Sequence, residues 1–331
     1  MQPLTYRKAV SEDDAIAILA SSNARIIAGG TSLFDLMKLG VETPSDLLDV
    51  TFIPGLNQIV RGAGAIEFGA LVRMSEVNNQ PELVADYPVL AESLSKAASQ
   101  QLRNMATLGG NLLQRTRCGY FRNSLHYACN KRSPGSGCAA RDGLDRSHAV
   151  LGGSSDCIAV YPGDFAVALT ALDAEVETIS QHGSRRYRIG EFYRLPGSTP
   201  HLETVLAPQE MIARIIVPTG RLGRASTYHK IRDRESYAFA LASAAVALDL
   251  EDDRIRSARI ALGGVATRPW RVTEAEALLQ GQSFNEELAR EAGRVAMRGA
   301  QAGRHNEFKI ELGARTVADA LRIAYDRGTR T

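Results

Sequence analysis

Three of the four cysteines lie in one polar stretch, QRTRCGYFRNSLHYACNKRSPGSGCAARDG, which spans residues 114–143, and Cys157 follows shortly after it. The stretch is rich in Gly, Pro, Ser, Arg and Asn, so the burial of aliphatic side chains cannot supply the free energy that orders it. A metal centre could do so, because the free energy of ligation is also free energy of folding. Four thiolates are the ligand set of a structural zinc ion or of a cubane iron–sulfur cluster.

The spacing of the thiols leaves several chemistries open. Intervals of 10, 8 and 18 residues separate Cys118, Cys129, Cys138 and Cys157. None of these is the compact C-x-x-C of zinc ribbons or ferredoxins. On spacing alone, a metal centre, free structural thiols and disulfides all remain open. His126 and His148 lie nearby as further candidate ligands, although four thiols already complete a ligand set.

Two glycine pairs form a second set of residues with possible chemistry. AGGTS (28–32) and TLGGN (107–111) both contain Gly-Gly beside hydroxyl or amide side chains. A loop between a strand and a helix presents backbone N–H groups to an anion such as a phosphate, and glycine permits its close approach. A tight turn with no ligand has the same sequence, and neither loop matches the G-x-G-x-x-G fingerprint or a Walker loop. Two such loops favour a long ligand with two anchoring points, such as a dinucleotide.

Overall composition is that of an ordinary globular protein. The chain has 331 residues, 44% hydrophobic and 23% charged, with a net charge of +2. This balance gives no indication of binding to nucleic acid or to an acidic membrane surface. No apolar run approaches the roughly 20 residues that span a bilayer. The first residues lack the layout of a signal peptide, so a cytoplasmic location is expected, where thiols stay reduced.

The elements that position these residues divide into three expected regions. Residues 1–60 should form a small α/β unit with parallel strands near 24–30 and 45–50 and a helix over 31–40, for which Thr31 and Ser32 are N-cap candidates. Residues 61–220 should form a second unit, with the cysteine-rich insert at about 114–157. The apolar periodicity predicts strands at 65–72, 174–179 and 211–218 and helices at 88–104 and 164–172.

The third region follows a glycine- and arginine-containing break at 220–224. Three antiparallel strands are expected over 226–231, 237–250 and 254–266, with the acidic turn 251–253 joining the last two. Helices are expected over 273–281, 285–300 and 315–328. The sequence thus predicts an α+β protein whose last region, 221–331, is a three-stranded antiparallel sheet with helices.

Five motifs occur in order: IIAGGTSLFDLMK, FGALVRMSEV, QLRNMATLGGNL, YPGDFAVAL and YHKIRDRESYAFALAS. Together they resemble the FAD-binding (medium) subunits of the molybdenum hydroxylases, the xanthine dehydrogenase and aldehyde oxidoreductase group, and the resemblance covers nearly the whole chain. It implies a vanillyl-alcohol-oxidase-type (PCMH) fold with FAD between the two N-terminal units.

The resemblance also assigns cofactor-binding positions. For the pyrophosphate and adenine side of FAD these are Ile26, Ile27, Ala28, Gly29, Gly30, Thr31, Ser32, Leu33 and Phe34. Thr107, Gly110 and Asn111 would hold the diphosphate and ribityl region, and Asp164 the ribityl hydroxyls. Ile212 and Lys230 match positions near the isoalloxazine ring, with Tyr237 as a further candidate. Gly163 departs from the Ser-Asp pair common in the family, which removes one hydroxyl contact.

Taken singly, two of these positions also have ordinary structural explanations. Asp164 could cap the helix that follows it, and Lys230 could be a solvated strand residue.

The resemblance extends to the cysteines. Asn111 and Asp164 are 53 positions apart, whereas they are close in flavin subunits without a cluster, and the excess holds all four thiols. This insert is similar to that of the bacterial periplasmic aldehyde oxidoreductase branch, whose flavin subunit carries an extra 4Fe–4S cluster. It implies that Cys118, Cys129, Cys138 and Cys157 are cluster ligands, with zinc as the alternative. Neighbouring Arg115, Arg117, Arg122, Lys131 and Arg132 are expected to offset the cluster charge.

The function implied is electron transfer within a heterotrimer. A large molybdenum-cofactor subunit would oxidise an aldehyde to a carboxylic acid, a small subunit would carry two 2Fe–2S clusters, and electrons would reach FAD here and pass to an external acceptor. No catalytic residue for substrate chemistry is expected in this chain. Alternatives are the same subunit in a xanthine dehydrogenase, CO dehydrogenase or hydroxybenzoyl-CoA reductase type of enzyme, a free-standing FAD oxidoreductase, or a zinc-stapled protein without flavin. Co-export with a partner would make the location periplasmic.

Overall fold

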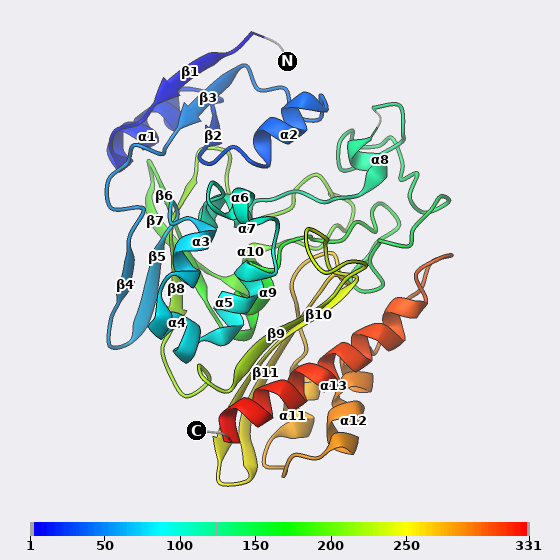
Figure 1. Cartoon of the computed structure of the whole chain (residues 1–331). Coiled ribbons are helices and arrows are strands. Elements are labelled where there is room, and N and C mark those ends of the chain that lie inside the picture. The colour runs from blue at the N-terminus through cyan, green and yellow to red at the C-terminus, as the bar shows by residue number, and fades with distance from the viewer. Residues whose placement is uncertain (1–2, 124, 330–331) are drawn as a thin grey trace.

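A computed structural model describes residues 3–123 and 125–329 (Figure 1). The first elements are β1 (Thr5–Lys8), α1 (Glu12–Ser21), β2 (Arg25–Ile27), α2 (Leu33–Lys38) and β3 (Asp46–Asp49). The strands form a three-stranded parallel sheet in the order β1-β3-β2. The predicted parallel pairing of β2 with β3 is confirmed. β1 and α1 were not predicted, because the four residues of β1 are all exposed and carry no apolar alternation.

The central sheet has five strands in the order β4-β5-β8-β6-β7, all antiparallel. Its strands are β4 (Ile59–Arg61), β5 (Ala65–Gly69), β6 (Glu175–Ser180), β7 (Gly183–Arg188) and β8 (Met211–Pro218). The helices of this region are α3 (Met74–Asn78), α4 (Pro81–Asp86), α5 (Pro88–Ser95), α6 (Gln100–Arg103), α7 (Leu108–Leu112), α8 (Gly119–Arg122), α9 (Phe165–Ala171) and α10 (Ile189–Phe192).

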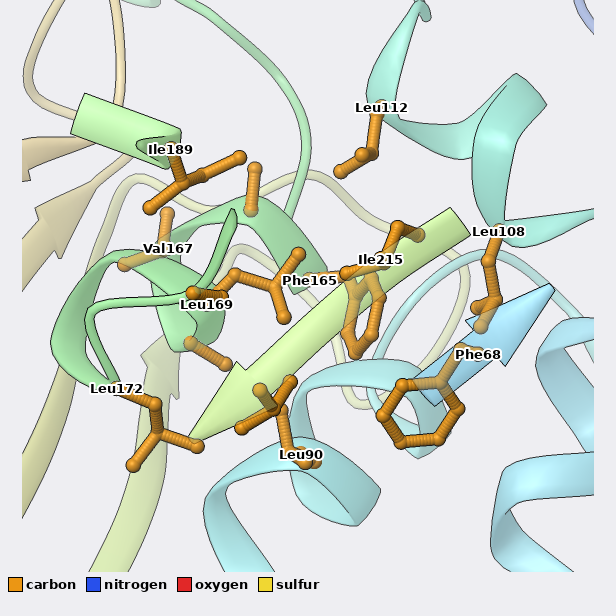
Figure 2. Packing of buried hydrophobic residues seen from close by; sticks show 14 of the residues in the cluster. Phe68, Leu90, Leu108, Leu112, Phe165, Val167, Leu169, Leu172, Ile189 and Ile215 are labelled. Carbon is orange, nitrogen blue, oxygen red and sulfur yellow. The ribbon is translucent and has the colours of Figure 1, made fainter. Parts of the chain in front are cut away.

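One large apolar core joins the central sheet to its helices (Figure 2). Phe68 of β5 and Phe165 of α9 meet edge to face, with ring centroids 6.4 Å apart. Leu108 and Leu112, on the two ends of α7, reach the same core. The helix that carries the second glycine pair is therefore held by the core of the molecule.

The C-terminal sheet has the order β12-β11-β10-β9. Its strands are β9 (Ser226–Ile231), β10 (Ala242–Glu251), β11 (Arg254–Gly263) and β12 (Trp270–Arg271), and the helices are α11 (Thr273–Leu279), α12 (Glu286–Ala296) and α13 (Phe308–Thr329). The three predicted strands are present, and the two-residue β12 adds a fourth. α13 packs on β9 and β10, whereas α5 and α9 pack on the other side of the sheet (Figure 1). β9 and β10 thus join the C-terminal region to the central core.

Two predicted helices differ from the observed ones. The helix predicted over 88–104 is two helices, α5 and α6, because Ala98 takes a left-handed conformation (φ 48°) and Ser99 then caps α6 by accepting from Leu102 N–H. The apolar residues Val89, Leu90, Leu94 and Ala97 of this segment are nevertheless buried. The last helix begins at Phe308 rather than Arg315. Its first turns carry the polar Lys309 and Glu311, which hid the helical pattern.

The cysteine-rich insert carries only the single turn of α8 as regular structure among its described residues. Backbone hydrogen bonds attach its last part to the segment after β11: Val150 and Leu151 N–H both donate to Val265 C=O, at 2.9 and 3.1 Å. Tyr161 N–H donates to Ala266 C=O in the same way. The insert therefore lies between the N-terminal part of the molecule and the C-terminal region.

Among the described residues, no helix has the length and apolar character that would let it cross a membrane.

Candidate functional site

The two glycine loops lie close together, although 74 residues lie between them in the sequence. A Cβ atom added to Gly29 would lie 2.0 Å from the carbonyl oxygen of Met105 and 3.2 Å from Cα of Ala106. Only glycine permits this approach. AGGTS follows β2, and Met105 stands just before TLGGN, so the fold brings together the two anchoring points predicted for one long ligand.

The first loop leaves polar groups at the start of α2. Gly30 has φ +69°, a left-handed conformation that favours glycine. Ser32 occupies the N-cap position, as predicted, but its side chain makes no capping hydrogen bond. The backbone closes the turn instead, as Phe34 N–H donates to Gly30 C=O at 3.0 Å. The Ser32 hydroxyl therefore makes no cap to α2, although the Ser32 carbonyl accepts from Leu36 N–H at 3.1 Å.

The second loop forms the start of α7 and is fixed by a helix cap and by contacts with Ala70. Thr107 is the N-cap and accepts from Gly110 N–H at 3.3 Å. Gly109 N–H donates to Ala70 C=O at 2.9 Å, and a Cβ at Gly109 would lie 2.9 Å from the Ala70 Cβ. The Asn111 amide oxygen is buried with no partner. A buried polar atom without a partner costs stability, so Asn111 fits a ligand that donates a hydrogen bond to it.

Asp164 and Lys230 form a buried ion pair. Lys230 Nζ donates to Asp164 Oδ2 at 2.8 Å, and the side chains are 1% and 6% exposed. The Tyr228 hydroxyl donates to Asp164 Oδ1 at 2.5 Å. Burial, with the Asp164 carboxylate adding to it, raises the pKa of Tyr228 well above its usual value. Both structural explanations fail: Asp164 makes no side-chain cap to α9, and Lys230 is not solvated.

Sequence reasoning missed Tyr228, although a signal for it existed. Alternate residues of a strand face one side of the sheet, so a tyrosine two positions before Lys230 on β9 shares its face. Lys230 Nζ also donates to the carbonyl of Lys96 at 3.0 Å, at the C-terminal end of α5. A cation at that position complements the helix dipole.

The remaining flavin candidates lie in different settings. Ile212 of β8 is buried in the large core. Tyr237 is 57% exposed with φ +52°, so it is not a core tyrosine. Arg234 donates to its carbonyl and lies over its ring.

Tyr161 explains the departure at Gly163. A Cβ at Gly163 would lie 2.5 Å from the Tyr161 hydroxyl, so the ring fills the space of a serine side chain. That hydroxyl donates to Leu112 C=O at 3.1 Å, as Tyr193 does at 3.0 Å, which ties this segment to the end of α7.

All four cysteines line one small cavity inside the insert, together with Asn130 and Lys131. None is in a disulfide. Cys118, Cys129 and Cys157 are buried, and Cys129 and Cys138 face each other through an isolated antiparallel bridge. The structure thus brings together the predicted ligand set and gives no support to the disulfide alternative.

Burial raises the pKa of the Cys118 thiol to about 12, with Cys129 and Cys157 adding to the effect. The pKa of Cys157 is raised by burial too, although Lys131 opposes the shift. Both thiols are protonated near neutral pH unless a cation compensates the charge of the thiolate.

The basic residues around the thiols were predicted to offset the charge of a cluster, but most of them form ion pairs or hydrogen bonds with other groups. Arg115 pairs with Glu42 and Glu203, each at 2.6 Å. Arg117 and Arg122 pair with Asp35 of α2. The pairs with Glu42 and Asp35 dock the insert against the N-terminal unit, whereas Glu203 belongs to the segment that precedes β8.

Two further cations behave differently from these arginines. Arg132 donates to four backbone carbonyls of residues 120–127 and so orders the loop. Lys131 lines the thiol cavity, although Nζ also pairs with Glu203 at 2.9 Å.

His148 lies next to one of the four thiols. Its Nε2 lies 3.2 Å from Cys118 Sγ. In the described part of the chain, no three His, Cys, Asp or Glu side chains come close enough together to hold one metal ion. The arrangement is thus a cavity surrounded by four thiols, with no single-ion site.

Sequence comparison defines the class of protein. Residues 2–220 match the family described as the FAD binding domain in molybdopterin dehydrogenase. Residues 226–324 match the CO dehydrogenase flavoprotein C-terminal domain. The chain therefore belongs to the FAD-binding subunits of the molybdopterin dehydrogenases.

Two proteins of known name show how similar this chain is to individual relatives. The chain is 46% identical over 326 residues to the aldehyde oxidoreductase FAD-binding subunit PaoB of Escherichia coli, covering 97% of this chain and 98% of that one. It is 26% identical to the glyceraldehyde dehydrogenase medium chain of Sulfolobus acidocaldarius, over 87% of this chain and 84% of that one.

Among solved structures, carbon monoxide dehydrogenase from Hydrogenophaga pseudoflava matches with a TM-score of 0.77 and 25% identity, over 98% of each chain. Quinoline 2-oxidoreductase from Pseudomonas putida 86 matches with a TM-score of 0.75 at the same identity and coverage. The predicted α+β fold, with its flavin domain and C-terminal antiparallel sheet with helices, is confirmed.

Proposed function

We propose that this chain is the FAD- and iron–sulfur-carrying subunit of a heterotrimeric molybdenum aldehyde oxidoreductase. The observation that carries the proposal is the 46% identity, over nearly the whole of both chains, to the FAD-binding subunit of an aldehyde oxidoreductase. A large partner subunit would bind the molybdenum cofactor and oxidise the aldehyde to a carboxylic acid. A small partner would carry two 2Fe–2S clusters, which link the molybdenum site to this chain.

The proposed flavin site consists of the two glycine loops and the Asp164–Lys230 pair. The close approach of Gly29 to Met105 brings the two loops together, and backbone N–H groups of such loops suit a diphosphate. The unpartnered Asn111 oxygen suits a ribityl or ring donor. Asp164 offers carboxylate oxygens to ribityl hydroxyls, held in place by Lys230 and Tyr228. Ile212 and Lys230 remain the candidates for the ring side.

The proposed iron–sulfur site is the thiol cavity. A zinc ion needs its sulfurs about 2.3 Å from one point, and the described residues contain no such single-ion site. A cubane cluster spreads its cysteines over separate irons, which suits four thiols around a cavity. We therefore propose Cys118, Cys129, Cys138 and Cys157 as the ligands of a 4Fe–4S cluster.

FAD and the cluster, once bound, would supply the capacity to accept and release electrons. The protein's part is to hold them and set their surroundings. Asp164 is fixed by two donors and cannot turn away from a ligand. Arg115 and Arg122 hold the insert against Glu42 and Asp35, which keeps the thiol cavity beside α2.

The division into regions 1–60, 61–220 and 221–331 remains part of the proposal. It is supported by the separate sheets β1-β3-β2, β4-β5-β8-β6-β7 and β12-β11-β10-β9. A periplasmic location through co-export with a partner is likewise proposed from the sequence resemblance.

Isolation of the native complex under anaerobic conditions tests the proposal. We expect three different subunits, molybdenum, one FAD and iron for one 4Fe–4S and two 2Fe–2S clusters, with aldehyde oxidation. A colourless chain that contains zinc would contradict it. Oxidation of xanthine or CO instead of aldehydes would move the chain to another enzyme of the same family, and aldehyde oxidation by the chain alone would show a free-standing flavoenzyme.

A further inference from the structure

A buried histidine beside one of the four thiols has no part in the proposed flavin site. His148 is 2% exposed, and its Nε2 lies 3.2 Å from Cys118 Sγ. The Tyr120 ring stands beside it, with centroids 6.1 Å apart. The buried imidazole is thus aimed at one particular sulfur of the four.

The position of His148 is set by the C-terminal region. The backbone N–H of His148 donates to Asp145 C=O at 2.8 Å, and the backbone carbonyl of His148 accepts from Asn306 Nδ2 at 3.4 Å. Asp145 is fixed in turn, because its carboxylate accepts from the backbone N–H of Arg304 and of His305, each at 2.8 Å. The segment that leads into α13 therefore holds the imidazole against the insert.

The surroundings of the ring select its tautomer. Nδ1 is buried with no partner. A neutral imidazole carries one proton. If that proton were on Nδ1, a buried N–H would have no acceptor and the Nε2 lone pair would face the sulfur. With the proton on Nε2, the N–H donates to the sulfur, and only an acceptor is left without a partner, which costs less.

We propose that His148 is a positioning residue that donates its Nε2–H to the sulfur of Cys118 and thereby raises the reduction potential of the iron–sulfur centre. The inference rests on the proposed cluster. Hydrogen bonds to the sulfurs of a cluster are among the determinants of its potential. A donor favours the state with more negative charge on sulfur, which is the reduced state.

Two variants of the native complex separate tuning from structure. His148→Leu removes the donor, whereas His148→Gln keeps an N–H donor on a side chain of similar reach. Iron per chain is measured first, and the potential of the 4Fe–4S centre is then found by EPR-monitored titration, with the FAD potential as an internal reference. His182→Leu, in the exposed β6–β7 turn, is the matched control.

We expect His148→Leu to move the reduction potential of the 4Fe–4S centre by about 59 mV to more negative values. This shift corresponds to a tenfold change in the one-electron equilibrium constant. His148→Gln should restore most of this shift, and His182→Leu should match the unchanged protein. An unshifted potential in a fully loaded His148→Leu complex would overturn the inference, and so would a His148→Gln variant that behaves like His148→Leu. If this chain of the wild-type complex contained no iron, the proposed cluster itself would be refuted.

A second measurement needs no variant, in case His148→Leu fails to assemble. Pulsed EPR on the reduced native complex, labelled with ¹⁵N-histidine, should detect an exchangeable proton and a weak nitrogen coupling at the 4Fe–4S centre. A strong coupling would mean that His148 ligates iron directly, and the absence of any coupling would mean that no hydrogen bond reaches the sulfur. Either result would overturn the inference.

Discussion

Lys230 Nζ and Asp164 Oδ2 lie 2.8 Å apart in a pair that is almost wholly buried. Lys230 comes from β9 of the C-terminal sheet, and Asp164 immediately precedes α9, whose core is shared with the central sheet. The pair therefore couples the docking of these two regions to the orientation of a carboxylate proposed to contact the flavin.

Lys230→Met should leave the Asp164 carboxylate buried without its cation. Breaking one side of a buried pair costs about 3–5 kcal/mol, and we expect a loss of that order in the free energy of unfolding, measured by urea denaturation, with loss of bound flavin. Arg290→Gln removes an exposed partner of Glu286 and should cost at most about 1 kcal/mol. The double variant Lys230→Met with Asp164→Leu should regain stability but not flavin. Equal effects of Lys230→Met and Arg290→Gln would contradict the role of the pair.

Gly29→Ala should separate the two glycine loops. The new Cβ would meet the Met105 carbonyl oxygen at 2.0 Å, and neither backbone can yield without moving AGGTS away from TLGGN. We expect the flavin content of the purified complex to fall at least tenfold. Gly190→Ala, where a Cβ meets nothing within 4 Å, is the control. Retention of full flavin by Gly29→Ala would remove the two-loop site.

Asn111→Leu should affect the empty and loaded protein in opposite ways. The amide oxygen is buried without a partner and Nδ2 reaches only Met74 Sδ at 3.5 Å, so an apolar replacement of similar size should leave the flavin-free protein as stable or more so. Flavin affinity, measured by fluorescence titration, should fall by about 1–3 kcal/mol because a hydrogen bond is lost. A variant that destabilises the flavin-free protein while binding FAD normally would show that Asn111 is structural.

The sequence predicted elements best where a physical signal was local. The strand 211–218 matches β8, because an apolar run interrupted only by Arg214 ends at Pro218, which cannot extend a ladder. The break at Ala98 was missed because a left-handed alanine carries no sequence signal.

The same distinction holds for the candidate site. The four cysteines could be predicted as one group from their residue type, and in the structure all four line one cavity. The partnership of Asp164 with Lys230 spans 66 residues and no periodicity encodes it. The docking of arginines on Asp35 and Glu42 was also beyond sequence reasoning, since ion pairs depend on which elements become neighbours.

Removal of iron should loosen the insert locally. If ligation orders this polar segment, then chelation of iron, or Cys157→Ser, should expose Arg122, Lys131 and Arg132 to trypsin. Arg185 and Arg186, in the exposed β7 strand, should be cut at an unchanged rate and serve as internal controls. Cleavage sites identified by mass spectrometry check this. An insert that resists trypsin equally with and without iron would mean that its ion pairs alone order it.

Lys309 should give the protein a distinctive alkaline pH dependence. Its side chain is buried, with Nζ donating to Gly264 C=O at 2.7 Å, and burial lowers its pKa from 10.5 to about 8, with Arg146 adding to the shift and Asp233 opposing it. Between pH 8 and 10.5 the unfolded chain holds a proton that the folded protein has lost, so stability should rise with pH in that window.

Between pH 7 and pH 10, the free energy of unfolding of the wild-type protein should therefore rise by about 2–3 kcal/mol relative to that of Lys309→Met. The hydrogen bond to Gly264 is not the cause, because a neutral amine still donates and the variant lacks the bond at both pH values. Urea denaturation of both proteins across this range measures the difference, with Lys38→Met as the control for loss of an exposed lysine. Parallel curves for the unchanged protein and Lys309→Met would mean that Lys309 keeps its ordinary protonation in the folded state.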